Sequence, residues 1–155
     1  MKTSHSINAL RSNSLPSSAS GPPVTQTLTP AQIEAAVEEY FASVASLDAQ
    51  RYANNFVTEG VLEDPVGTPP IEGQQAIAAF YAAGTAAITE LKPTVQKVIA
   101  GGNEAIVNWK IRVKTATGKQ ITVDGMGLFK FNSAGKLLAV REFFDMTAFL
   151  AQLQN

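Results

Sequence analysis

The amino-acid sequence predicts an α+β domain in which three helices precede a curved antiparallel sheet and cover one of its faces. Apolar residues recur with helical spacing between residues 29 and 87. From Lys92 onward they alternate with polar residues, as they do in half-buried strands. Helices and strands separated along the chain in this way are typical of α+β folds. Of the 155 residues, 45% are hydrophobic and 16% are charged, so the chain can build one core.

Residues 1–28 differ in composition from the rest of the chain. They are rich in Ser, carry no acidic residue and include few large apolar residues. We therefore expect a disordered leader before a domain that spans residues 29–155. The leader has no apolar run of the kind found in secretory signals. This composition favours a cytoplasmic protein, although a basic, Ser-rich and acid-free leader is also typical of organelle-targeting peptides.

The first predicted helix has a clear start. Thr29 can cap it, Pro30 suits the first helical position, and Gln32 can complete a capping box. The apolar residues that follow at helical spacing form one inward stripe. They are Ile33, Val37, Tyr40, Phe41 and Val44.

Two more helices are expected before the sheet. Asp48 is the predicted cap of the second, with Tyr52 and Phe56 on its buried side. The third spans residues 74–87. Its inward residues are Ile77, Phe80 and Tyr81.

Strands fill the second half of the chain. The first runs from Lys92 to the pair Gly101-Gly102, and the second alternates apolar and polar residues over 105–114. Turns in "TATGKQ" and "NSAGK" precede the next two strands, which read "ITVDGMGLFKF" and "LLAVREFFDM". A short helix over residues 147–154 follows the last strand.

The composition excludes several kinds of chemistry. The net charge is −1, whereas binding to nucleic acid needs a basic excess. The absence of cysteine excludes disulfides, thiol catalysis and thiolate metal sites. The single histidine, His5, lies in the leader, so the domain has no imidazole base. Proton chemistry must use Asp, Glu, Tyr, Lys or Arg, and we expect no cofactor, metal, nucleic acid or membrane as partner.

One acidic residue stands at an unusual place, in the stretch "VLEDPVGTPPIEG" over residues 61–73. This stretch combines three prolines and two glycines with apolar residues. Asp64 lies directly before Pro65, although an ionised carboxylate is costly to remove from water. From the residues alone, Asp64 suits a turn or capping position before Pro65.

Two segments of the sequence resemble a known family. "EYFASVASLDAQRYANNFVTEGVLEDPVGTPPIEGQQAIAAFY" is similar to the corresponding region of ketosteroid isomerases, and "FKFNSAGKLLAVREFF" resembles their closing hairpin. Together they cover most of residues 34–146, and "EDPVG" is the most specific part. The wider superfamily is called SnoaL-like or nuclear transport factor 2-like. Its fold is a cone, in which a curved sheet surrounds a pocket that helices close.

The resemblance implies roles for four residues. Asp64 matches the general base, which moves a proton from one carbon to another. Tyr40 matches the tyrosine that donates a hydrogen bond to the oxyanion, and Tyr81 matches the tyrosine that bonds to it. Trp109 falls on the pocket side of its strand. Each of the three aromatic residues also suits a plain core position, with its polar group satisfied.

One element of the family pattern is missing. The second oxyanion donor, a protonated Asp, is replaced by Gly127. Asp124 lies three residues earlier, so on a regular strand it points to the opposite face, and only a bulge would bring it inward. Removing one oxyanion donor costs about two to three orders of magnitude in rate. We therefore expect slow isomerisation, and a gain in rate for Gly127→Asp provided that the strand tolerates a side chain there and the new carboxyl stays protonated.

The end of the last strand suggests a competing site. "REFFDM" resembles the "RxYFD" ending of limonene-epoxide-hydrolase-like proteins, in which the Asp acts as an acid or base. Here that residue is Asp145. The Arg-x-Asp pair that such hydrolases also need is replaced by Lys110 and Arg112. Asp145 is alternatively an ion-pair partner of Arg141. The remaining residues predicted to line the pocket are Val66, Phe80 and Phe144.

Three classes of function stay open. The first is an isomerase that shifts a double bond in a steroid-like or other cyclic enone, with Asp64 as base and Tyr40 as oxyanion donor. The second is another SnoaL-like enzyme: a cyclase, hydratase or epoxide hydrolase that uses Asp64 or Asp145. The third is a non-catalytic protein that binds an apolar small molecule. The family resemblance also implies a homodimer.

Overall fold

The first helix begins at the predicted cap. In the computed structural model, which describes residues 26–155, α1 spans Pro30–Ala45. Gln32 N donates to Thr29 Oγ1 at 3.2 Å, and Thr29 N donates to Gln32 Oε1 at 2.8 Å, so the capping box is complete. Tyr40 lies on the buried stripe of this helix.

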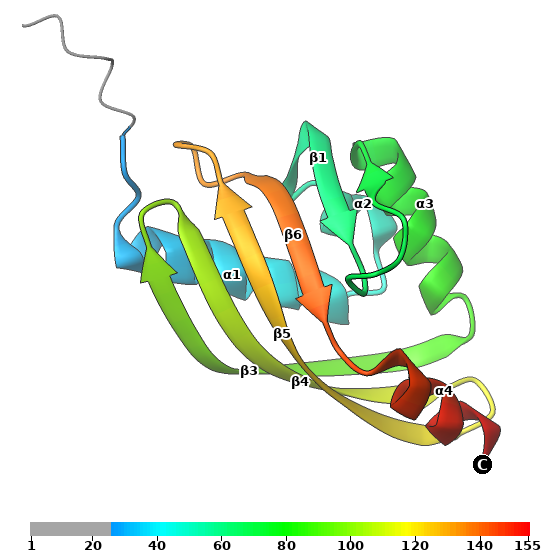
Figure 1. Cartoon of the computed structure of the whole chain (residues 1–155). Helices are drawn as coiled ribbons and strands as arrows, with labels where there is room; N and C mark the ends of the chain where they lie inside the picture. The colour runs from blue at the N-terminus through cyan, green and yellow to red at the C-terminus, as the bar shows by residue number, and fades with distance from the viewer. Residues whose placement is uncertain (1–25) are drawn as a thin grey trace, which may run out of the picture.

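Further helices follow α1 along the chain. The remaining helices are α2 (Ala49–Ala53), α3 (Gln74–Thr85) and α4 (Met146–Gln154). Figure 1 shows α1 lying across the concave side of the curved sheet, with α3 beside β1 and α4 following the end of β6. Within residues 26–155, no helix combines the length and hydrophobicity needed to cross a membrane.

Six strands form one sheet in the order β2-β1-β6-β5-β4-β3. The strands are β1 (Phe56–Glu63), β2 (Ile71–Glu72), β3 (Ile88–Gly101), β4 (Glu104–Thr115), β5 (Gln120–Phe131) and β6 (Leu137–Phe143). The antiparallel meander from β3 to β6 confirms the alternating pattern in the second half of the chain. The predicted α+β class is therefore correct.

Phe56 lies on a strand and not, as was predicted, on the second helix. α2 ends at Ala53, and Phe56 opens β1. β1 pairs with β6 in parallel, with Leu62 opposite Val140. The sheet is thus not purely antiparallel. Apolar and polar residues alternate only partly along β1, and a register shift interrupts its pairing, so period two is hard to detect there.

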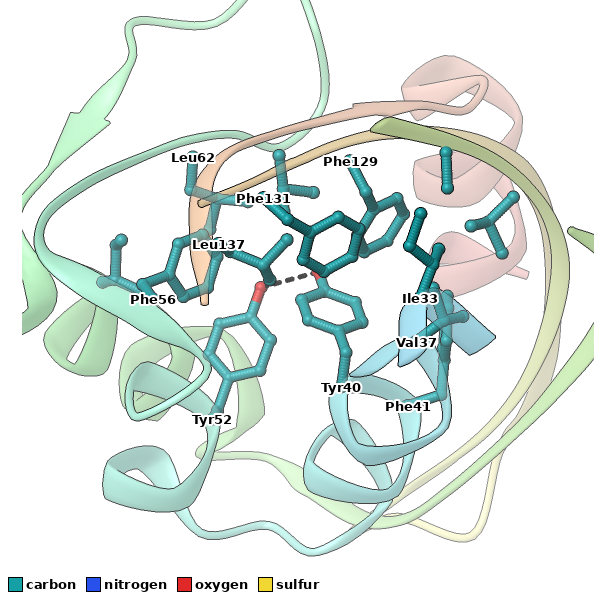
Figure 2. Packing of buried hydrophobic residues seen from close by; sticks show 14 of the residues in the cluster. Ile33, Val37, Tyr40, Phe41, Tyr52, Phe56, Leu62, Phe129, Phe131 and Leu137 are labelled. Carbon is teal, nitrogen blue, oxygen red and sulfur yellow. Dashed lines mark hydrogen bonds between the residues drawn. The ribbon is translucent and has the colours of Figure 1, made fainter. Parts of the chain in front are cut away.

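The core lies between α1 and the concave face of the sheet. Figure 2 shows side chains from α1, α2, β1 and the last two strands meeting there, with Phe129 packed edge-on against Tyr40. Register shifts in the pairing of β3 with β4 accompany the bend that makes this face concave. Bending lets long strands surround a space that helices alone do not fill.

The domain begins earlier than the composition predicts. Leu28, assigned by composition to the leader, is 7% exposed and belongs to the core. Leu28 N donates to Asn103 Oδ1 at 2.8 Å, and Asn103 Nδ2 donates to Gln26 O at 3.3 Å. The boundary at residue 29 is thus too late. Residues 1–25 lie outside the described part, so the prediction that they are disordered stays a prediction.

Two truncations test this boundary. Deleting residues 1–25 should leave the thermal midpoint within about 2 °C of that of the full chain. Deleting residues 1–28 should lower the midpoint by roughly 3–10 °C, because it also removes one buried side chain and its backbone hydrogen bond. Differential scanning calorimetry of both variants measures the difference. Equal midpoints would show that Leu28 contributes nothing to stability.

Candidate functional site

The sheet and helices enclose a cavity of about 300 Å³. Most of its walls are apolar side chains from α1, α3, α4 and the sheet. They are Phe41, Val44, Phe80, Leu91, Ile111, Val113, Val123, Phe144, Met146 and Phe149. Its polar lining side chains are Tyr40, Tyr52, Asp64, Tyr81, Trp109 and Glu142. An apolar cavity with a few polar groups is the usual form of a small-molecule site.

Asp64 reaches this cavity because of the pairing between β1 and β6. The two strands run in parallel with Glu63 opposite Arg141, so the next residue on each strand is Asp64 and Glu142. Val66 N donates to the backbone oxygen of Glu142 at 2.8 Å, which holds the loop after Asp64 against β6. Asp64 therefore belongs to a backbone framework and not to a free loop.

The Asp64 carboxylate is prepared to accept a proton. No side chain or backbone group of residues 26–155 donates a hydrogen bond to it, and it lines the cavity. Burial raises the pKa of Asp64 to about 6. The group is thus largely ionised at neutral pH but more basic than an exposed aspartate.

Four buried side chains form a hydrogen-bonded cluster beside Asp64. The Tyr40 and Tyr52 hydroxyls are 3.0 Å apart, and Figure 2 shows them pointing toward one another from α1 and α2. Tyr40 Oη lies 3.2 Å from Glu142 Oε1, and Trp109 Nε1 donates to Glu142 Oε2 at 2.7 Å. Glu142 is only 4% exposed, so the cluster brings a nearly buried carboxyl into the site.

Glu142 and Asp64 differ in their affinity for protons. Burial is the main cause that raises the pKa of Glu142 to about 8, and the negative charge of Asp64 adds to it. The hydrogen bonds from Trp109 and Tyr40 act in the opposite direction but do not cancel the shift. As the pH rises, Asp64 loses its proton first, while Glu142 is still neutral. The negative charge of Asp64 then hinders ionisation of Glu142. At neutral pH the pair holds one carboxylate and one carboxylic acid.

Tyr81 does not bond to Tyr40 as the family resemblance implies. Its hydroxyl donates to Val44 O at 2.7 Å, and its ring stacks on Tyr52 with centroids 4.6 Å apart. The carbonyls of the last turn of a helix have no partner within the helix, so the end of α1 provides an acceptor that Tyr40 would otherwise supply. Tyr52 takes the place at Tyr40 that was predicted for Tyr81.

The space predicted for a second acid is filled from the neighbouring strand. Gly127 faces the cavity side of β5, opposite Glu142 in the register. A Cβ at Gly127 would lie 2.8 Å from Glu142 Oε2 and 2.5 Å from Phe129 Cε2. The expected gain in rate for Gly127→Asp required a strand that tolerates a side chain there, and this condition is not met, because the added Cβ would collide with Glu142 and Phe129.

Asp124 stays on the outer face. The pairing of β4 with β5 has no register shift, so no bulge turns this residue inward. Its carboxylate forms an exposed ion pair with Lys110 at 3.6 Å.

The other predicted pocket residues divide into two groups. Trp109 and Phe144 line the cavity, with ring centroids 6.1 Å apart in an edge-to-face arrangement. Phe80 also lines it and is 37% exposed, which places it at the rim. Val66 does not line the cavity, and its backbone binds β6 instead.

Asp145 is a helix cap. Ala148 N donates to Asp145 Oδ1 at 2.9 Å, at the start of α4. The carboxylate is exposed and does not line the cavity, so the prediction of an acid or base at this position is wrong. Arg141 pairs with Glu63 at 3.2 Å and not with Asp145, so the alternative ion pair is wrong as well.

Glu142 and the hydroxyl of Tyr52 were not among the predicted site residues. A signal for Glu142 was present, because it alternates in phase with Val140 and Phe144, which point to the core. A carboxylate at a buried position of a strand is costly unless it is paired or neutral. No comparable signal marks Tyr52, since its place on the buried side of α2 fits any core tyrosine.

Metal ions have no evident place in the described part of the chain. Over residues 26–155, no group of three or more His, Cys, Asp or Glu side chains is arranged to hold a metal ion.

Comparisons with known proteins agree with this architecture. Residues 37–140 match the model of the SnoaL-like domain family. A steroid Δ-isomerase from Nocardioides simplex is 29% identical over 115 residues, which cover 74% of this chain and 90% of the relative. The family resemblance predicted from "EDPVG" is therefore confirmed at the level of the family.

Two solved structures share the fold. The epoxide hydrolase/cyclase-like enzyme SalBIII, studied for pyran ring formation in the polyether salinomycin, superposes with a TM-score of 0.68. It is 23% identical, over 76% of this chain and 93% of that one. A hypothetical protein from Catenulispora acidiphila with a ketosteroid isomerase-like fold, in complex with trimethylamine, has a TM-score of 0.69. Its identity is 15%, over 76% and 90% of the two chains. The expected cone fold is confirmed.

The shared space between Gly127 and Glu142 can be tested by adding one methyl group. Gly127→Ala should lower the free energy of unfolding by about 1–3 kcal/mol, because Glu142 and Phe129 must move. It should also change the fluorescence of Trp109, the only tryptophan, whose N–H holds the displaced carboxyl. Urea unfolding measures the first effect. The matched control is Gly101→Ala, another strand glycine, whose added Cβ meets nothing within 4 Å. Similar losses in both variants would contradict the assignment.

Proposed function

Because the chain belongs to the SnoaL-like domain family, we propose that it catalyses proton transfer alpha to a carbonyl group. The reaction shifts a double bond in a steroid-like or other cyclic enone. Asp64 is the base, and Tyr40 donates a hydrogen bond to the oxygen on which charge develops.

A single observation carries this proposal. A carboxylate with raised basicity and a buried phenol line the same apolar cavity. Carbon acids are weak, so their deprotonation needs a strong base together with a donor that stabilises the enolate oxygen. The cavity supplies both.

The proposed reaction returns every proton that it removes. Asp64 takes a proton from the carbon between the ketone and the double bond of a β,γ-unsaturated ketone. The electron pair of that C–H bond moves into a dienolate, whose oxygen accepts a hydrogen bond from Tyr40. Asp64, now protonated, gives the same proton to the γ carbon. The double bond is then conjugated with the ketone, and the enzyme has recovered its starting state.

The cavity limits the ligand to a compact apolar ring system. Its volume of about 300 Å³ lies at the small end of the range typical for ligand sites. The aromatic rings of Trp109, Phe144 and Phe149 suit a flat ring, and Phe80 lies at the rim where a longer ligand would emerge. The steroid named in the Nocardioides simplex relative agrees with such a shape.

Opening of an epoxide by water or by an internal hydroxyl is a second candidate. This reaction needs a base and an acid. The same cavity holds a carboxylate, Asp64, and a neutral carboxyl, Glu142. The attacking oxygen would form a bond to one epoxide carbon while the C–O bond at that carbon breaks, and Asp64 would take the proton of the attacking O–H. The hydrogen-bonded cluster beside Asp64 would give a proton to the epoxide oxygen, and the proton on Asp64 would then return to the cluster. Cyclic epoxides therefore belong among the substrates assayed.

Replacing the proposed base tests the reaction. Asp64→Asn should lower kcat for isomerisation of a bicyclic β,γ-unsaturated ketone by at least about a hundredfold, followed by the absorbance of the conjugated product. In the wild type, kcat/KM should rise with pH through about 6, where Asp64 loses its proton. The matched control is Asp124→Asn on the outer face, which should retain activity.

The same variant should keep or gain stability at neutral pH. Folding raises the pKa of Asp64, so the ionised form is disfavoured in the folded protein. Between the unfolded and folded pKa values the folded state binds more protons, and its stability falls as pH rises. Asparagine removes that cost. If no enone or epoxide is converted but an apolar ligand binds, the chain is a binding protein, and the proposed reaction is excluded.

We also propose that two copies pair through the outer face of the sheet. Several large apolar side chains are exposed there, on β3 to β6. They are Ile99, Ile106, Met126, Leu128, Leu138 and Phe143. The register places Ile99 opposite Ile106, Ile106 opposite Leu128, and Met126 opposite Phe143, so the patch is continuous. It borders a wide hollow of about 630 Å³. A continuous apolar patch of this kind marks an interaction surface.

One charge on this face should separate the copies. Leu128→Lys should shift the protein from dimer to monomer at micromolar concentration in sedimentation equilibrium, because two lysines would be buried near each other. Leu150→Lys on α4 is the control, since Leu150 is also exposed but lies away from the sheet face. A wild type that stays monomeric over the accessible concentrations would refute the dimer.

A further inference from the structure

The hydrogens of the buried cluster can be counted against the contacts that use them. Three contacts connect its four side chains. They join Tyr52 to Tyr40, Tyr40 to Glu142, and Trp109 to Glu142. Within residues 26–155 the two hydroxyls and the carboxyl have no other hydrogen-bond partner. Each contact needs one hydrogen, so the count is closed.

With Glu142 ionised, the cluster has no hydrogen to spare. A carboxylate only accepts hydrogen bonds. The hydrogens of Tyr52, Tyr40 and Trp109 then fill the three contacts, one each. The Tyr40 hydroxyl points to Glu142, and a ligand oxygen can receive a hydrogen bond only if a contact breaks.

With Glu142 protonated, the cluster has four hydrogens for the same three contacts. Either hydroxyl can donate in the contact between Tyr40 and Tyr52. In the arrangement in which both Glu142 and Tyr52 donate to Tyr40 Oη, the hydrogen of Tyr40 is free to point into the cavity. Two hydrogen bonds to its oxygen also polarise the Tyr40 hydroxyl, which makes it a stronger donor.

We propose that Glu142 is a positioning residue whose proton releases the Tyr40 hydroxyl to donate to a ketone oxygen in the cavity. This inference rests on the proposed function in one respect, which is that the bound oxygen belongs to a ketone. The residue acts from β6, through Tyr40, and occupies the space that a side chain at Gly127 would need. Loss of its proton turns the Tyr40 hydroxyl away from the ligand.

The groups that face Glu142 make it the first of the cluster to lose a proton above neutral pH. Asp64 after β1, Tyr40 on α1, Tyr52 on α2 and Tyr81 on α3 are the titratable groups that line the cavity with it. β4 and β5 add none, and no Lys, Arg or His of residues 26–155 is among the lining residues. The pKa of Glu142 is about 8, whereas burial holds those of Tyr40 and Tyr52 well above their usual value.

The availability of the Tyr40 hydroxyl as a hydrogen-bond donor can be measured from binding alone, without any reaction. The measurement compares the Kd values of two ligands that differ only in the ketone oxygen. One probe is a bicyclic α,β-unsaturated ketone, and the other is the same ring system with CH₂ in place of the carbonyl. The preference of the wild type for the ketone, as a ratio of Kd values, should fall roughly three- to tenfold between about pH 6.5 and about pH 9.5. The midpoint should lie near the pKa of Glu142, about 8.

Three variants assign the pH dependence to Glu142. In Glu142→Gln the ratio should not change with pH, because the amide donates to Tyr40 and accepts from Trp109 at every pH. The matched control is Glu63→Gln, which replaces the glutamate that pairs with Arg141. In this variant the ratio should change with pH as in the wild type. In Asp64→Asn the midpoint should move to lower pH, because the charge that hinders ionisation of Glu142 is gone. Far-ultraviolet circular dichroism at each pH verifies folding.

The outcomes separate this inference from the proposed reaction. A constant ratio in the wild type over the whole pH range overturns the role of Glu142, and so does a change that persists in Glu142→Gln. If Glu142→Gln does not fold, the shift of the midpoint in Asp64→Asn decides, and an unshifted midpoint overturns the inference. A ratio that changes as described in a protein without isomerase activity supports the role of Glu142 and refutes only the reaction.

Discussion

The parallel pairing of β1 with β6 is the constraint on which the site depends. Without it, Asp64 would end an exposed loop and Glu142 would be an isolated buried acid. With it, two carboxyls share one low-dielectric space from adjacent strands, and the negative charge of Asp64 raises the pKa of Glu142. Neither strand is long, so a few backbone hydrogen bonds, including that from Val66, determine where the chemistry takes place.

Much of the framework could be predicted from local chemistry. The start of α1 followed from Thr29, Pro30 and Gln32, because a capping box depends only on residues close in sequence. The meander followed from alternation, which is equally local. β1 was missed because it becomes a strand by pairing with β6, about 80 residues later in the chain. No residue near β1 in the sequence indicates this pairing.

The site was predictable where it repeats a family pattern and obscure where it departs from one. Asp64 and Tyr40 could be found because their matches follow each other without a gap. The contacts among the hydroxyls could not be found in this way, since a small displacement of one ring decides whether Tyr40 contacts Tyr52 or Tyr81. Asp145 was misjudged because a capping aspartate and a catalytic aspartate look alike in sequence.

The absence of a side chain at Gly127 has a consequence for substitutions on the neighbouring strand. Positions 127 and 142 share one volume, so a side chain at either requires a small residue, or a different direction, at the other. A side chain at position 127 therefore fits this fold only if the side chain at position 142 changes with it, and the free-energy effects of substitutions at the two positions should not be additive.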